Sequence, residues 1–232
     1  MQRSYQTPHP VPDPKWQNRE VSFADELAQL LPQDLPHRDN VIRKSALHLD
    51  MIVEINKVMN LTRITDPREA AIKHVLDSVL PWRLFADALH VVDAGTGPGF
   101  PGIPLSLVLP DVKFSLLEAT QKKARFVQSV VDELRLPNVQ VIPQRAEEWI
   151  HHNHADIVTG RAVAPLHKAF LIFAPALKND ARVLLYKGPD VATEITEAAP
   201  ESRKRRIEFR ILERYELPDS LGERTIVEML RS

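Results

Sequence analysis

The sequence predicts an α/β fold in which an N-terminal helical module precedes a seven-stranded, mainly parallel sheet that ends in an antiparallel hairpin. Apolar residues recur at helical spacing in the first third of the chain, short apolar segments alternate with helix-like stretches after residue 90, and two strand-like segments follow residue 199. Strands that alternate with helices form parallel sheets with right-handed crossovers. We expect a disordered Pro-rich leader over 1–16, the helical module over 17–85 and the sheet domain over 86–232.

The first third of the chain contains the signals of three helices after the leader, in which prolines alternate with other residues and forbid a helix. Apolar residues at three- and four-residue spacing predict helices over about 21–31 and 39–59. A third helix begins at Asp66, where a carboxylate that can cap the helix is followed by Pro67 and Glu69. It is expected to end near Leu80.

The rest of the chain supplies the strands. Five short apolar segments predict the parallel part of the sheet, at residues 91–92, 114–117, 139–142, 157–158 and 183–186. The clearest helix between them covers about 121–134. The segments 207–212 and 224–230, with Pro218 and Gly222 between them, predict a hairpin at the sheet edge.

Composition excludes several classes of protein. The 232 residues are 44% hydrophobic and 26% charged, which is ordinary for a globular protein. No apolar run approaches the roughly 18 residues of a membrane-spanning helix, and the first 20 residues are too polar for a signal peptide. The absence of cysteine excludes disulfides, thiolate metal sites and thiol nucleophiles, and fits a cytoplasmic protein. The net charge is −1, although Lys122, Lys123 and Arg125 form one basic cluster and residues 203–206 another.

The glycines are concentrated in one loop. The chain has 7 glycines, of which four occupy positions 95, 97, 99 and 102, between a predicted strand and a predicted helix. Such a loop brings a nucleotide-like ligand close to backbone N–H groups at the carboxyl end of a strand. The pattern G-x-G-x-x-G leaves an NAD-dependent oxidoreductase open. Asp93 instead favours a ligand that carries cationic groups, such as S-adenosyl-L-methionine, and Glu118 would accept ribose hydroxyls of either ligand.

The segment Asp93–Leu105 resembles the D-x-G-x-G-x-G-F-P-G-x-P-L signature of the RsmG (GidB) family, which methylates N7 of a guanine in small-subunit ribosomal RNA. Further resemblances follow in the family's order over about residues 60–188: Asn60-Leu61-Thr62, His74-Val75-Leu76-Asp77-Ser78, Lys122-Lys123 with Phe126, Arg145-Ala146-Glu147, Arg161-Ala162 and Lys187-Gly188. The chain departs from the family pattern at Glu118-Ala119, where Asp-Ser is usual, at Pro98, and at Gly160.

The resemblance implies a Rossmann-like class I methyltransferase that uses S-adenosyl-L-methionine and acts in the cytoplasm on 16S ribosomal RNA or the small ribosomal subunit. The residues that it implies for the cofactor are Asp93, Gly95, Gly97, Phe100, Glu118, Ala146, Glu147 and Arg161. Those that it implies for RNA are Asn60, Lys122, Arg145 and Lys187, for which a solvated surface charge is the alternative. For Arg161, the alternative is an ion pair with Asp156 or Glu147.

The implied chemistry needs no catalytic acid or base. Guanine N7 attacks with a lone pair that carries no proton, so catalysis depends on positioning and on surrounding charges. We therefore expect no catalytic residue in the acid–base sense and no metal. His151, His152 and His154 are expected to form an exposed surface cluster. The NAD-dependent oxidoreductase and a non-catalytic RNA-binding module for ribosome assembly remain the alternatives.

Overall fold

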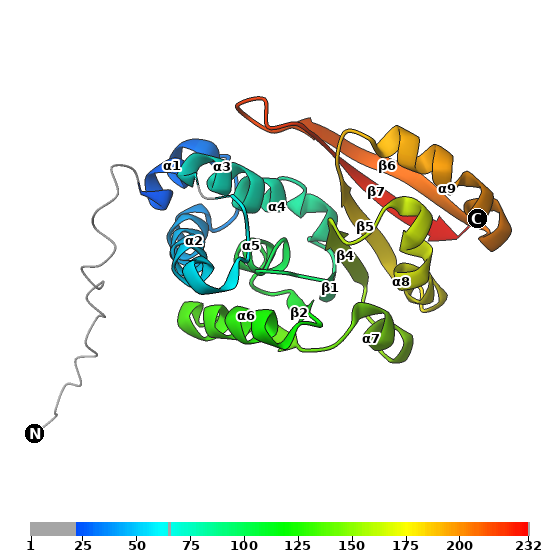
Figure 1. Cartoon of the computed structure of the whole chain (residues 1–232), viewed down its shortest axis with the longest axis horizontal. Coiled ribbons are helices and arrows are strands. Elements are labelled where there is room, and N and C mark those ends of the chain that lie inside the picture. Colours follow the sequence, from blue (N-terminus) through cyan, green and yellow to red (C-terminus); the bar gives the residue numbers. More distant parts are fainter. Residues whose placement is uncertain (1–21, 65, 232) are drawn as a thin grey trace, which may run out of the picture.

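A seven-stranded sheet crosses the computed structural model of the chain, which describes residues 22–64 and 66–231 (Figure 1). Its order is β3-β2-β1-β4-β5-β7-β6, with parallel pairing from β3 to β5 and antiparallel pairing of β7 with β5 and β6. The strands are β1 His90–Ala94, β2 Lys113–Leu117, β3 Val139–Ile142, β4 Ile157–Arg161, β5 Arg182–Lys187, β6 Ile207–Glu216 and β7 Glu223–Arg231. The predicted sheet and its terminal hairpin are confirmed. The predicted leader over 1–16 lies outside the described residues.

The strand order creates a switch point beside β1. After β1 the chain adds β2 and β3 on one side of this strand, and then returns to add β4 and β5 on the other side. The loops that follow β1 and β4 therefore leave the sheet in opposite directions, and a crevice opens between them at the carboxyl ends of the strands. Ligands of open α/β sheets bind in this position.

Helices cover both faces of the sheet. In the N-terminal part these are α1 Phe23–Leu30, α2 Arg38–Met59, α3 Pro67–Ala70, a π-helical stretch Ala71–Leu76, α4 Asp77–Val79 and a short 3-10 helix Trp82–Phe85. Five follow within the sheet region: α5 Gly102–Val108, α6 Gln121–Leu134, α7 Ala146–His152, α8 Leu166–Lys178 and α9 Val191–Arg205. None of the described helices is long and apolar enough to cross a membrane.

The helix predicted from Asp66 to Leu80 is confirmed in its start and differs in its interior. Asp66 Oδ1 accepts the backbone N–H of Glu69 at 2.8 Å, and Pro67 occupies the first turn. The stretch from Ala71 to Leu76 is π-helical, a conformation that occurs mostly as single turns within α-helices and often at functional sites. The apolar spacing alone does not distinguish this stretch from an ordinary α-helix.

The buried side chains form two clusters, one on each face of the sheet. Alternation along β1 places Val91 in the cluster with α1, α2, α5 and α6, and Val92 in the cluster with α7, α8 and α9. The helical module thus shares one continuous core with a face of the sheet. The domain boundary expected near residue 85 stays a prediction, and no separate core marks it within the described residues.

Candidate active site

A cavity of about 520 Å³ opens at the carboxyl ends of β1, β4 and β5, where the helical module meets the sheet. Its wall includes Gly95 and Gly97 after β1, Arg161 at the end of β4, Lys187 at the end of β5 and His74 of the π-helical stretch. The predicted cofactor loop therefore lies on the wall of a cavity at the switch point of the sheet. The volume is in the range of small-molecule sites.

The glycine loop has a backbone that favours glycine and is open to a ligand. The φ angles of Gly95, Gly97 and Gly99 are 74°, 59° and 111°, a region that side-chain-bearing residues rarely adopt. Gly95 and Thr96 donate their N–H groups to Leu117 O at 3.0 and 2.9 Å, which fastens the loop to the end of β2. A Cβ atom on Gly97 would meet nothing within 4 Å, and its N–H makes no hydrogen bond to the described residues.

Asp93 holds this loop from behind. The residue is fully buried and does not line the cavity. Its Oδ2 accepts hydrogen bonds from Thr96 Oγ1 at 2.7 Å and from Gly102 N at 2.8 Å, so one carboxylate joins both ends of the loop. Oδ1 has no partner within the described part of the chain, and burial raises the pKa of the carboxyl to about 6. The geometry supports a role in shaping the loop, and direct contact with the cofactor stays a prediction.

Phe100 lies in a stack of three rings. His48 of α2 stacks on one side and His74 on the other, each with its ring centroid 4.7 Å from that of Phe100. Burial lowers the pKa of His48 to about 4 and that of His74 to about 3, so both imidazoles are neutral near pH 7. His48 Nε2 lies 2.8 Å from Pro98 O, and because a carbonyl can only accept, this nitrogen carries the proton. The stack fixes the loop against the helical module.

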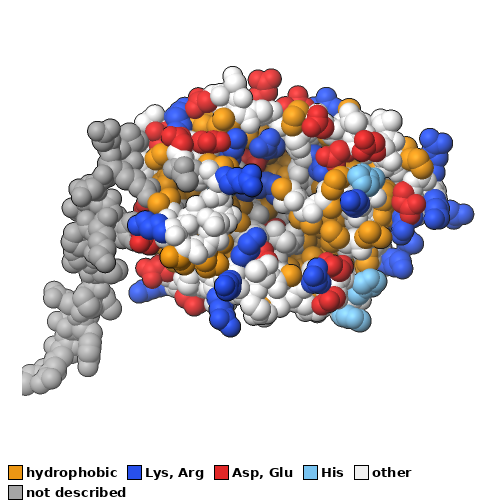
Figure 2. Space-filling model, viewed as in Figure 1, with side chains coloured by type: hydrophobic (Ala, Val, Ile, Leu, Met, Phe, Trp, Pro, Cys, Tyr) orange, Lys and Arg blue, Asp and Glu red, His pale blue; other side chains and the backbone are white. Residues whose placement is uncertain are grey.

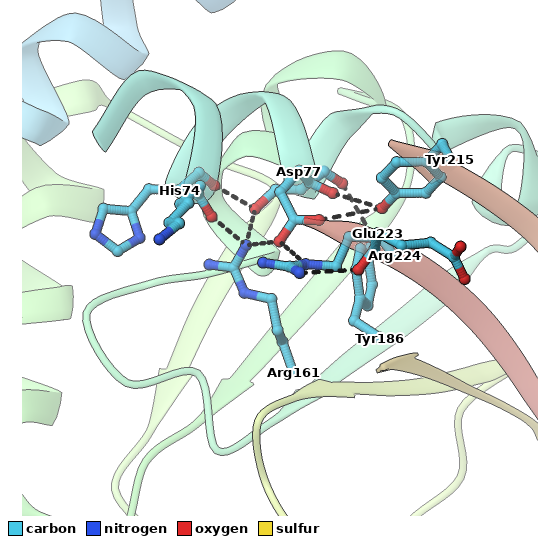
Figure 3. Close-up of polar contacts among 9 residues, drawn as sticks. His74, Asp77, Arg161, Tyr186, Tyr215, Glu223 and Arg224 are labelled. Carbon is cyan, nitrogen blue, oxygen red and sulfur yellow. Dashed lines mark hydrogen bonds and ion pairs between the residues drawn. The ribbon is translucent and has the colours of Figure 1, made fainter. Parts of the chain in front are cut away.

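Arg161 is held by a buried carboxylate from the helical module (Figure 3). Its Nη1 donates to Asp77 Oδ2 at 3.0 Å, and also to Lys73 O and Ser78 Oγ. The same oxygen of Asp77 accepts from Arg224 Nε of β7 at 3.3 Å, and Tyr215 of β6 donates its hydroxyl to Asp77 Oδ1 at 3.2 Å. Asp77 thus joins the helical module, β4 and the hairpin at the cavity wall.

The expected alternative partners of Arg161 are wrong. Asp156 accepts the N–H groups of Leu89 and His90 at 2.7 and 2.8 Å. Glu147 forms an ion pair with Arg145, in which Oε1 lies 3.7 Å from Nη1. The ion pair of Arg161 with Asp77 leaves the guanidinium on the cavity wall, so it does not remove Arg161 from the candidate site.

The residues predicted to hold the adenosine part follow β2 and β3 in the chain and are not among the residues that line the cavity. Glu118 follows β2 directly and accepts the N–H of Thr120 at 2.7 Å, while its own N–H donates to Ile142 O. Ala146 is the buried first residue of α7, and the half-exposed Glu147 follows it. The bonds from Gly95 and Thr96 to Leu117 O place Glu118, the next residue, beside the glycine loop. Ala146 and Glu147 begin α7, after β3. Their contact with the cofactor stays a prediction.

The predicted RNA residues separate into two kinds. Asn60 at the end of α2, Lys122 in the first turn of α6 and Arg145 before α7 are exposed. Lys187 is buried on the cavity wall, where its Nζ lies 2.6 Å from Glu194 Oε2 and donates to Ala164 O. Lys187 is therefore part of the cavity rather than of the outer surface. The three exposed residues stay predictions.

Several residues of the cavity wall were not predicted as site residues: His74, Asp77, Glu194 and Arg224, with His48 directly behind the loop. Asp77 and His74 lie within a segment that resembles a family motif, which is the signal that could have found them. Glu194 and Arg224 reach the site only through contacts between distant parts of the chain. The structure confirms that three histidines are exposed, at the end of α7 and just after it: His151, His152 and His154.

Comparison with known proteins connects this geometry to a family. The model of the family described as rRNA small subunit methyltransferase G (GidB) matches residues 42–219. The chain belongs to this family. A Ribosomal RNA small subunit methyltransferase G from Solibacter usitatus is 64% identical over 209 residues, which cover 90% of this chain and 100% of that protein. One from Carboxydothermus hydrogenoformans is 38% identical over 183 residues, which cover 76% and 77% of the two chains.

Solved structures agree on the fold. An O-methyltransferase from Bacillus cereus in complex with SAH matches with a TM-score of 0.55 at 16% identity, over 80% of this chain and 91% of that one. Magnesium protoporphyrin IX methyltransferase from Synechocystis with bound SAM matches with a TM-score of 0.54 at 16% identity, over 80% and 97%. The predicted Rossmann-like methyltransferase fold, enzyme class and cofactor, S-adenosyl-L-methionine, are confirmed. The NAD-dependent oxidoreductase is wrong.

Proposed function

We propose that this GidB-family protein transfers a methyl group from S-adenosyl-L-methionine to N7 of a specific guanine in 16S ribosomal RNA. The observation that carries the proposal is the glycine loop with its open backbone at Gly97, placed on a cavity at the switch point of the sheet. Family membership supplies the ribosomal RNA substrate class. The resemblance of the segment from Asp93 to Leu105 supplies the guanine N7 specificity.

The residues present fit the cofactor. Gly97 offers an open approach to its backbone and an N–H without a partner among the described residues. Glu118, at the end of the neighbouring strand β2, would accept hydrogen bonds from the ribose hydroxyls. Arg161 lines the cavity, and its guanidinium would pair with the carboxylate of the methionine part. Ala146 and Glu147 would flank the adenine from the start of α7. Asp93, which is buried behind the loop, would keep the loop in shape, and Phe100, which lines the cavity, would border the ligand as well.

The cofactor supplies an electrophilic methyl group on a positively charged sulfur. The lone pair of guanine N7 forms the new bond to carbon, the carbon–sulfur bond breaks with its electron pair left on sulfur, and the positive charge passes to the guanine. No proton is removed in this step, so the protein has no acid–base task. What the chain contributes is the alignment of the two reactants and the charges around them.

The acceptor would enter from the side of β4 and β5. We assign the adenosine part to Glu118 and Ala146 at the ends of β2 and β3, and this assignment leaves the part of the cavity between Arg161 and Lys187 for the guanine. A base must leave its stack to reach a cavity of this kind. Figure 2 shows Lys and Arg side chains gathered over the middle of the molecular face seen there, as expected for contact with RNA phosphates.

The helical module would form one wall of the RNA entrance, with Asn60 at the end of α2, while Lys122 and Arg145 border the sheet side. The basic residues 203–206 lie at the far end of α9, about 16 Å from Glu194 at 1.5 Å per helical residue, so they would meet a different part of the RNA. We place the reaction in the cytoplasm, where ribosomal subunits are made, and we propose no metal in it.

Transfer of tritiated methyl groups to small-subunit RNA, followed by mapping of N7-methylguanine, tests the function. Both naked 16S RNA and assembled subunits from cells that lack the protein should be tried, and one of them should gain label at one guanine. Gly95→Val should abolish transfer because a side chain at φ 74° distorts the loop. Absence of label with either substrate, while S-adenosylhomocysteine still binds, would favour the non-catalytic RNA-binding module.

A further inference from the structure

The cavity wall contains two carboxylates, and they differ in what they can still bind. Within the described residues the lining includes Asp77 and Glu194. Asp77 is 1% exposed and both of its oxygens are engaged, by two arginines and by the hydroxyl of Tyr215. Glu194 is 22% exposed, and its Oε2 alone makes the contacts to the protein. Glu194 Oε1 is thus available to a ligand.

Glu194 is held in place rather than solvated. Its Oε2 accepts the N–H of Leu166, the first residue of α8, at 2.8 Å, and lies 2.6 Å from Lys187 Nζ. Lys187 is itself anchored, because it is 9% exposed and donates to Ala164 O. By contrast, Glu197, one turn further along α9, is 56% exposed, and its Oε2 lies 3.6 Å from Nδ1 of His167. A carboxylate fixed at one oxygen presents the other without a further loss of side-chain entropy.

The position of Glu194 is on the acceptor side of the cavity. Leu166 and Ala164 belong to the segment that follows β4, and Lys187 ends β5. The predicted adenosine residues lie on the other side of β1, at the ends of β2 and β3. Glu194 therefore faces the space that the proposed function leaves for the guanine.

We infer that Glu194 is a specificity-determining residue that accepts hydrogen bonds from N1–H and the 2-amino group of the target guanine. This inference rests on the proposed function and adds to it how the base is chosen. The free Oε1 has two acceptor lone pairs, and guanine presents two neighbouring donors, N1–H and the 2-amino group, on the edge opposite N7, so this one oxygen can accept both. Holding that edge leaves N7 free to react. Adenine has an acceptor at N1, which a carboxylate repels.

The charge of Glu194 also suits the reaction. Methyl transfer moves a positive charge onto the guanine, so a fixed carboxylate beside the base interacts more strongly with the product-like transition state than with neutral guanine. Lys187 offsets part of this charge and keeps Oε2 in place.

The kinetic test compares Glu194→Gln with the wild-type protein, using the small-subunit RNA that the wild type methylates. Gln keeps an acceptor for Leu166 N–H but loses the charge and half of the acceptor capacity. We expect kcat/KM for RNA to fall about 10- to 100-fold, with S-adenosylhomocysteine affinity unchanged within a factor of two. Glu197→Gln is the matched control and should keep both values. An unchanged kcat/KM in Glu194→Gln, or an equal loss of S-adenosylhomocysteine affinity, would overturn the inference.

Free nucleotides separate base reading from a merely structural effect. GMP and IMP differ by the 2-amino group, and inhibition of methylation by each measures the contribution of that group. The wild type should bind GMP about 10-fold more tightly than IMP, and the ratio should approach one in Glu194→Gln, whereas a structural effect would weaken both nucleotides equally. A ratio that persists in the variant contradicts the assignment, and if neither nucleotide inhibits, the kinetic comparison decides. Failure of the wild type to methylate RNA would instead refute the proposed function.

Discussion

Replacement of Asp77 by asparagine should destabilise the fold far more than an ordinary loss of one surface charge. The carboxylate is 1% exposed and neutralises Arg161 and Arg224, which are 16% and 19% exposed. Without its charge, two guanidinium groups that share one oxygen face each other unpaired. Breaking a buried pair costs about 3–5 kcal/mol, and we take about 3 because both arginines keep backbone hydrogen bonds, Arg161 to Lys73 O and Arg224 to Glu223 O.

Urea unfolding measures this loss directly, and a thermal melt should show a fall in Tm of about 6–12 °C at about 2–4 °C per kcal/mol for a chain of this size. Asp219→Asn is the matched control: this carboxylate pairs with Arg68 at 2.5 Å but is 45% exposed, so its loss should leave the urea midpoint almost unchanged. Cofactor affinity should also fall in Asp77→Asn, because Arg161 loses its anchor. Equal effects of the two variants would refute the reasoning from burial.

Three further outcomes follow from the loop and its neighbours. Glu118→Ala should weaken S-adenosylhomocysteine binding by about 1.5–3 kcal/mol in calorimetry, whereas Glu133→Ala, on the exposed side of α6, should not change it. Gly102→Ala should lower the free energy of unfolding by about 1–3 kcal/mol, since the new Cβ would lie 2.2 Å from Leu116 Cδ2; an unchanged urea midpoint would contradict this. Burial raises the pKa of Asp93 to about 6, so below this pH the folded state retains a proton that the unfolded chain has already released. Stability is therefore lost as the pH rises through 6, by about 1 kcal/mol between pH 5 and 7.5, and this loss should be absent in Asp93→Asn.

The sequence predicted what is encoded locally. The cap at Asp66, the alternation of strands and helices and the glycine loop each depend on residues that are close in sequence, and the structure contains all three. Gly95 and Gly97 could be placed on a binding site for the same reason. The hairpin was also expected, although its strands are longer than the apolar segments because β6 and β7 continue through polar residues to Glu216 and Glu223.

Local sequence patterns did not predict the contacts between segments that are far apart in the chain. Asp77 and Arg224 are 147 residues apart, and nothing in the sequence around either of them indicates the other. The family resemblance predicted that Lys187 contacts RNA, and the motif gives no information on burial. In the structure Lys187 is 9% exposed, and its Nζ contacts Glu194 Oε2 and Ala164 O. The π-helical stretch has the same apolar spacing as an α-helix, and tertiary packing decides between them.

The ring stack connects the helical module to the glycine loop. Phe100 cannot move without disturbing His48 of α2 on one side and His74 on the other, and His48 also donates to Pro98 O. These three contacts with the helical module add to the bonds by which Asp93 and Leu117 hold the loop to the sheet. The neutral state of both imidazoles matters here, because a protonated ring would be buried without a counter-charge and would repel Arg161 nearby. The helical module therefore supports the glycine loop through His48 and His74, and a shift of either ring would also shift Phe100 and Pro98.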